Sequence, residues 1–223
     1  MNTISYRSAS DINTAMAGVY KNMGLAVLTS MVISMLVASS PGLMALLFGT
    51  ALKWVVIFAP LVAVIALSFT LNKVSKTTAH LMLHGFAALM GVSMATIFVV
   101  YTSLSIFNAF MGAAILFGVM SVYGYFTKKD LSSFGQFLFI GLIAIVLASI
   151  VNIFIGSTVM QMVISAIGVI VFLGLTAYET QNIRDQISVS KEGNVEVVGA
   201  LSLYLNFINL FISLLQLFGN KNE

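Results

Sequence analysis

The last hydrophobic stretch of the chain, Val197 to Phe218, has the clearest pattern. It contains no charged residue, and its polar side chains recur at steps of four, three, four and three residues: Ser202, Asn206, Asn209, Ser213 and Gln216. This spacing places all five on one face of an α-helix. Unpaired amides are costly in lipid, so this polar face is expected to meet other helices or a wet cavity. The pattern therefore predicts a helix shielded at the centre of a bundle.

Polar interruptions divide the preceding chain into six further hydrophobic segments, and a transmembrane helix needs about 20 apolar residues. The expected segments are, in chain order, Met23 to Ala38, Trp54 to Asn72, two spans in Thr77 to Thr127 divided at Tyr101 to Ser105, and two in Leu131 to Tyr178 divided at Gly156 to Thr158. A hydrophilic loop, Glu179 to Glu196, is expected before the last helix. The predicted fold is thus an all-α polytopic membrane protein, with six transmembrane helices around a C-terminal seventh.

Residues 1–21 are mostly polar, and we expect a polar tail or a short surface helix there. Residues 22–220 are expected to form a single transmembrane domain. Near its start, the run from Ser39 to Gly42 has turn chemistry and predicts the end of the first span.

Composition agrees with a membrane protein. Hydrophobic residues make up 60% of the 223 residues and charged residues 8%, against roughly 25% charged in ordinary soluble domains. The net charge of +3 is spread singly and in pairs along the expected loops, which argues against nucleic-acid binding. Because the chain has no cysteine, disulfides, thiolate zinc sites and cysteine nucleophiles are excluded.

Basic residues concentrate on one side of the expected spans. With a cytoplasmic N-terminus, the outer side holds two, Lys53 and Lys221. The cytoplasmic side holds eight: Arg7, Lys21, Lys73, Lys76, Lys128, Lys129, Arg184 and Lys191. The positive-inside rule therefore predicts a multi-pass protein with a cytoplasmic N-terminus, and its short loops fit a bacterial inner membrane. The alternative for the last helix is that it re-enters from the cytoplasmic side, because its amides make it a costly lipid-facing span.

Glu179 is the carboxylate that directly follows an expected span. It ends a stripe along the sixth span whose other members are Ser165, Gly168, Phe172 and Thr176. Acidic groups in or beside membrane spans commonly serve ion or proton movement. An ordinary interfacial glutamate in contact with water would explain the same position.

Two motifs separate these alternatives. The run LGLTAYETQNIRDQ at 173–186, followed by ALSLYLNFINLFISLLQLFG at 200–219, closely resembles the C-terminal signature of the Bax inhibitor-1 (transmembrane Bax inhibitor motif) family, in its bacterial branch. The resemblance implies six helices around a central seventh, and a pH-sensitive calcium leak. In the family, an aspartate after the tyrosine of the sixth helix and another in the seventh share hydrogen bonds and close the pore at its cytoplasmic end.

This chain keeps the first acidic position of that pattern, with a side chain one methylene longer, and departs from it at the second. The first is Glu179, and the second is Asn206. Two carboxylates that share a site titrate as a coupled pair, but a glutamate beside an asparagine loses its proton in a single step. Asn206 is expected to donate a hydrogen bond to ionised Glu179. The loss of one negative charge should also weaken attraction for a divalent cation.

Other polar residues have weaker support. Lys73 or Lys76 could pair with Glu179 across the bundle, although lysines beyond a span end usually serve as interfacial anchors. His80 and His84 have a spacing that could bind a metal, but a site needs three or four ligands. We therefore expect neither a metal site nor a cofactor, with calcium considered only as a transported ion.

Enzyme functions are disfavoured. An aspartic intramembrane protease needs two membrane carboxylates, whereas Asp11, Asp130 and Asp185 lie in expected tails or loops. The chain also has neither a His-Glu-x-x-His motif nor a phosphate-binding Gly-Lys-Ser/Thr loop.

Two functions stay open. The first is the cation leak, gated at Glu179 and Asn206. The second, which the resemblance also implies, is regulation of a membrane quality-control protease or of a stress or cell-death pathway through a partner in the membrane, without transport.

Overall fold

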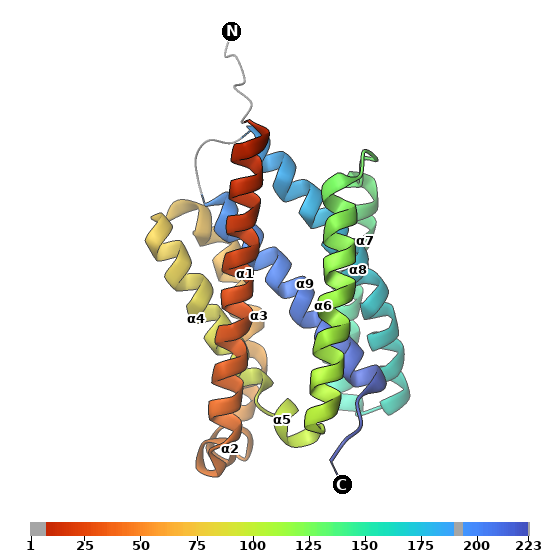
Figure 1. Ribbon diagram of the computed structural model, residues 1–223. Coiled ribbons are helices and arrows are strands. Elements are labelled where there is room, and N and C mark those ends of the chain that lie inside the picture. The colour runs from red at the N-terminus through yellow and green to blue at the C-terminus, as the bar shows by residue number, and fades with distance from the viewer. Residues whose placement is uncertain (1–7, 190–193, 223) are drawn as a thin grey trace. The chain divides into compact units, whose positions relative to one another are not determined.

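The computed structural model describes residues 8–189 and 194–222. Their long elements are all α-helices (Figure 1). In chain order the elements are α1 (Ala9–Ala38), α2 (Pro41–Phe48), α3 (Leu52–Thr70), the 3-10 turn η1 (Leu71–Lys73), α4 (Lys76–Met94), α5 (Ile97–Val100), α6 (Ser103–Phe126), α7 (Ser132–Ile155), α8 (Thr158–Val189) and α9 (Val195–Phe218).

Seven of these segments are long and apolar enough to cross a membrane, which confirms the predicted all-α polytopic fold. The most shielded is α9. In an apolar 18-residue stretch of α9, 72% of the residues are buried, compared with 11–39% in the other six spans. The last helix, despite its amides, therefore exposes the least surface of the seven.

Two helices are longer than the sequence pattern indicated. The expected polar tail is helical from Ala9, where Ser8 caps the start of α1 by accepting a hydrogen bond from the backbone of Asp11. The expected loop after Tyr178 is helical as far as Val189. Arg7 and Lys191, which were counted for the orientation, lie outside the described residues.

The chain divides into two compact units. The first unit contains α1 to α5 and α9 as far as Tyr204, together with the end of α8 from Gln186. The second contains α6, α7, α8 as far as Asp185, and α9 from Leu205. Both units include part of α9. The single transmembrane domain expected for residues 22–220 stays a prediction.

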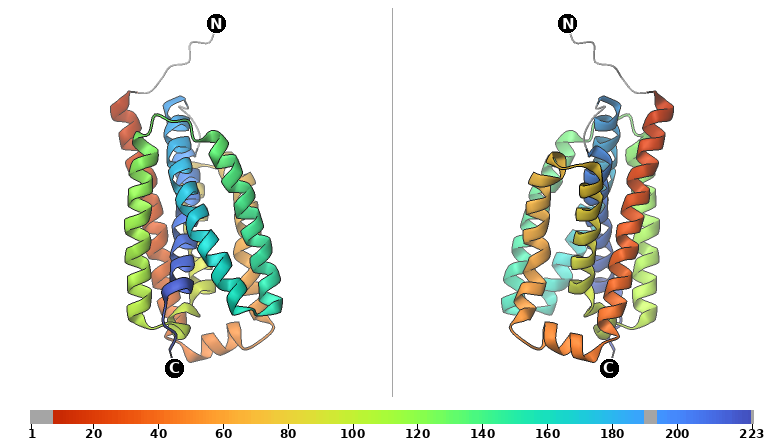
Figure 2. Two further views of the ribbon diagram at one scale, coloured as in Figure 1. Left: turned by 90° about the vertical axis from the view of Figure 1, so that its right-hand side faces the viewer. Right: turned by 90° about the vertical axis from the view of Figure 1, so that its left-hand side faces the viewer.

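In the first unit, α1 packs closely on α4 (Figure 1). Ser30 donates a hydrogen bond to the carbonyl of Ala87 at 2.7 Å, and Ser34 donates one to the carbonyl of Gly91 at 2.6 Å. A Cβ atom at Gly91 would lie 2.6 Å from the Ser30 carbonyl oxygen, so the close approach requires glycine. The short α2 runs crosswise between α1 and α3 (Figure 2).

The start of α9 is held within the first unit by two polar contacts. The side-chain amide of Asn194 donates to the carbonyls of Leu71 and Val74 at 2.6 and 2.9 Å. Lys76 forms an ion pair with Glu196 at 3.1 Å. Because the ion pair is exposed, the buried amide of Asn194 contributes more to fixing this end of the helix.

Candidate functional site

The C-terminal half of the α9 polar face meets the polar stripe of α8 within the second unit. Ser165 donates a hydrogen bond to the side-chain oxygen of Gln216 at 2.7 Å. Gly168 leaves room for Ser213, because a Cβ atom at position 168 would lie 2.7 Å from the Ser213 hydroxyl oxygen. These two contacts define an antiparallel register between α8 and α9.

Further amides join this contact where α7 turns into α8. Gln161 donates to Gln216 at 2.6 Å and accepts from Asn152 of α7 at 3.2 Å. We name the four residues Asn152, Gln161, Ser165 and Gln216 the amide cluster. The cluster ties three helices together by side-chain hydrogen bonds in a part of the chain that is otherwise apolar.

The other two members of the polar face behave differently. Asn209 donates to the carbonyl of Leu205 at 2.8 Å and so bonds within its own helix. Ser202 is half-buried and belongs to the first unit. The five aligned residues therefore do not form one continuous chain of hydrogen bonds.

Glu179 lies inside α8 and not at its end, because the helix continues for ten residues beyond it. Its carboxylate is half-buried and accepts a hydrogen bond from the side chain of Asn182. The ion pairs that the structure describes are Lys76 with Glu196 and Arg184 with Asp185, so neither includes Glu179. Glu179 is thus a carboxylate within a membrane span, stabilised by a neutral amide.

Asn206 lies on α9 in the same unit and is 6% exposed. Within residues 8–189 and 194–222 its Nδ2 has no hydrogen-bond partner. The expected donation from Asn206 to Glu179 is therefore not made. The α8–α9 register gives the reason: continued along both helices, it brings Asn206 level with Leu175, four residues and about 6 Å from Glu179 along the axis.

Contacts with α6 and with the connection to α7 hold the Glu179 segment in position. A Cβ atom at Gly124 of α6 would collide with the backbone of Ala177, so these helices touch. Gln181 donates to the Lys129 carbonyl and accepts from the backbone of Leu131, at 2.8 and 2.9 Å. Arg184 donates to the carbonyl of Tyr125.

Sequence reasoning missed Gln181 as a positioning residue. The available signal was indirect: buried Thr180, Ile183 and Ile187 recur at helical spacing, which indicates that the helix carrying Gln181 continues beyond Tyr178.

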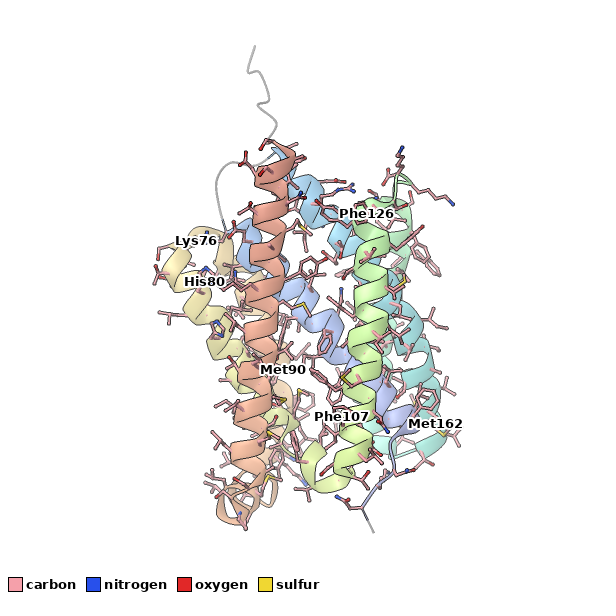
Figure 3. All side chains as sticks on the ribbon, in the orientation of Figure 1. Lys76, His80, Met90, Phe107, Phe126 and Met162 are labelled. Carbon is pink, nitrogen blue, oxygen red and sulfur yellow. The ribbon has the colours of Figure 1, made fainter. Side chains whose placement is uncertain are left out.

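The remaining predicted residues lie in the first unit (Figure 3). Lys73 is exposed in η1, and its pairing with Glu179 stays a prediction. Lys76, at the start of α4, pairs with Glu196 instead. One turn later on α4 comes His80, and the next turn carries His84, whose Nδ1 lies 3.2 Å from the hydroxyl of Thr29. No group of three or more His, Asp or Glu side chains that could hold a metal is found among the described residues.

Known proteins resemble this chain over nearly its whole length. Inner membrane protein YbhL of Escherichia coli (strain K12) is 43% identical over 217 residues, covering 94% of this chain and 93% of YbhL. A protein of Caulobacter vibrioides is 37% identical over 225 residues, covering 93% and 89% of the two chains. A protein of Borreliella burgdorferi is 37% identical over 217 residues, covering 95% and 94%.

The seven candidate spans and the similarity to inner membrane protein YbhL show that the chain is a multi-pass bacterial inner-membrane protein. The family described as "Inhibitor of apoptosis-promoting Bax1" matches residues 12–223. The chain therefore belongs to the Bax inhibitor-1 family.

Proposed function

We propose that this protein is a pH-sensitive cation leak of the Bax inhibitor-1 type, with calcium as the transported ion and a gate at Glu179 and Asn206. The observation that carries the proposal is the half-buried carboxylate of Glu179 within a membrane span, where it belongs to neither described ion pair. Acids in such positions are expensive and commonly serve ion pathways. With a cytoplasmic N-terminus, seven crossings place this part of α8 toward the cytoplasmic face.

The proposed pH response follows from the charge of one group. Ionised Glu179 supplies a negative oxygen ligand of the kind that calcium prefers, and protonation removes that charge. Asn206 is neutral at all physiological pH values, so the response involves one proton rather than a coupled pair. A single carboxylate also holds a divalent cation weakly, which suits passage better than storage.

The test measures calcium flux in liposomes that contain the purified protein and an enclosed calcium dye, over a series of pH values. Glu179→Gln should remove the pH-dependent part of the flux, because the amide keeps the size of the side chain and cannot titrate. Asp185→Asn is the matched control, since Asp185 is an exposed acid on the same helix and should leave the flux unchanged. Asn206→Asp should broaden the pH response into two steps.

A flux that is absent at every pH in the native protein, while a family member chosen for its measured calcium flux is active in the same assay, would argue against transport. A flux in the Glu179→Gln variant with the native pH dependence would remove Glu179 from the gate.

We also propose, as the second function, a regulatory partner in the membrane without transport activity. It is favoured by Asn206, which replaces the second acid of the family pattern. Removing residues 1–7 tests this proposal without cutting into α1, because that helix begins at Ala9 and its cap is Ser8. Loss of a co-purifying membrane protease with unchanged flux would favour regulation.

A further inference from the structure

Two buried polar side chains of the second unit, Ser121 on α6 and Asn206 on α9, each have one atom without a hydrogen-bond partner among the described residues. Each residue is 6% exposed. In the part of the chain that the structure describes, neither the Ser121 hydroxyl oxygen nor Asn206 Nδ2 takes part in a hydrogen bond. Buried polar groups are nearly always hydrogen-bonded in folded proteins, and an unpaired one commonly marks a bound water molecule or ion.

The two side chains lie at the same depth in the unit. Gly124 of α6 packs on Ala177 of α8. Because α6 and α8 are two spans apart, they run in the same direction. Three residues before that contact on each helix, Ser121 is therefore level with Gly174. The register between α8 and α9 places Asn206 level with Leu175.

A ring contact shows that α6 and α9 touch near these two residues. Phe117 of α6 meets Phe207 of α9 edge to face, with ring centroids 5.6 Å apart. Ser121 follows Phe117 by one turn, and Gly124, which packs on α8, follows Ser121 by three residues. Asn206 lies about 100° around α9 from Phe207, on the face whose Ser213 meets α8. Both residues therefore lie where α6, α8 and α9 meet.

Neither side chain donates a hydrogen bond to the backbone carbonyl four residues earlier in its own helix. Thr29, Ser68 and Thr176 each donate to the carbonyl four residues earlier, at 2.7–2.8 Å. Ser121 does not donate in this way. Asn209 bonds to the Leu205 carbonyl, whereas Asn206, three residues earlier on the same helix, makes no such bond through Nδ2. Both groups are therefore available to a ligand.

The chemistry of the two groups selects a small neutral ligand. Nδ2 can only donate, and a serine hydroxyl can donate or accept. A cation needs oxygen ligands and would be opposed by the Nδ2 hydrogens. We propose that α6 and α9 enclose an internal water site, in which one water molecule accepts from Asn206 Nδ2 and bridges to the Ser121 hydroxyl. This inference goes beyond the proposed leak, because it requires neither flux nor Glu179.

The test is nuclear magnetic resonance of the full-length protein in detergent micelles, with ¹⁵N in its asparagine side chains. Magnetisation transferred from water to the Nδ2 hydrogens is measured for Asn206 and for Asn209, whose Nδ2 is bonded to the backbone and serves as the internal control. The Asn206 signal is identified by its loss in Asn206→Leu, or by its loss in Asn206→Gln if the leucine variant does not fold.

We expect direct water transfer to Asn206 that is several-fold stronger than to Asn209, and its loss in Ser121→Ala. Equal transfer at the two asparagines would overturn the site. Strong transfer at Asn206 that persists in Ser121→Ala would overturn the bridge to Ser121.

Discussion

Removing the Ser30 hydroxyl should destabilise the first unit more than removing the Tyr204 hydroxyl that it contacts. The two oxygens lie 2.6 Å apart, and Tyr204 is fully buried. In Tyr204→Phe, Ser30 still donates to the carbonyl of Ala87, so no group is left unpaired. The expected cost is that of one ordinary hydrogen bond, about 0.5–1.5 kcal/mol.

In Ser30→Ala, the Tyr204 hydroxyl stays buried and loses the partner that the structure gives it. An unsatisfied buried donor costs about 1–3 kcal/mol. The double variant Ser30→Ala with Tyr204→Phe should be more stable than Ser30→Ala alone, because it leaves no unpaired hydroxyl. Ser34→Ala is the matched control, since Ser34 also donates from α1 to an α4 carbonyl but has no tyrosine beside it.

The assay is equilibrium unfolding in mixed micelles by titration with sodium dodecyl sulfate. The fluorescence of Trp54 reports on the first unit, because Trp54 is the only tryptophan and lies on α3. If Tyr204→Phe proves as destabilising as Ser30→Ala, or if Ser30→Ala costs no more than Ser34→Ala, the burial argument is refuted.

Two further substitutions test contacts described above. Gly91→Ala should destabilise the protein by about 1–3 kcal/mol, because the new methyl group meets the Ser30 carbonyl. The control is Gly85→Ala on the same helix, where the new methyl group meets nothing within 4 Å and should be neutral or stabilising. Equilibrium unfolding of the two variants in parallel checks the difference. In the loop before α7, the side-chain and backbone hydrogen bonds from Ser132 lower the pKa of Asp130 below its usual value. Any stability that this contact provides is present above the unfolded pKa of Asp130 and is lost as pH falls through the folded pKa. Ser132→Ala should therefore raise the pKa of Asp130, as followed by a carboxyl chemical-shift titration, and an unchanged titration would contradict the contact.

Hydrophobic periodicity was sufficient to predict the seven spans, because lipid requires long apolar helices with internally paired backbones. It failed where helices continue into polar sequence. Residues after Tyr178 read as a loop by composition, yet buried Thr180, Ile183 and Ile187 recur at helical spacing and keep α8 regular. The same effect hid the first turns of α1, where Met16 and Val19 are buried among polar neighbours.

The polar face of α9 was visible in the sequence, but its partners were not. Any stagger of one turn between α8 and α9 would also bring polar residues together, so spacing alone could not choose the register that pairs Gln216 with Ser165. Only the packed helices show that Gly168 accommodates Ser213 and that Asn206 is consequently offset from Glu179. Side-chain fit, and not periodicity, sets the geometry of the candidate site.

The length of α8 has a consequence for the depth of its acid. Its 32 residues span about 48 Å, whereas the hydrocarbon core of a bilayer is about 30 Å thick. Glu179 lies 21 residues after Thr158, or about 32 Å along the axis. In an upright helix that starts at one edge of the hydrocarbon, the carboxylate reaches the opposite edge, and tilting draws it inward. Bilayer thickness therefore decides how much bulk solvent this group meets.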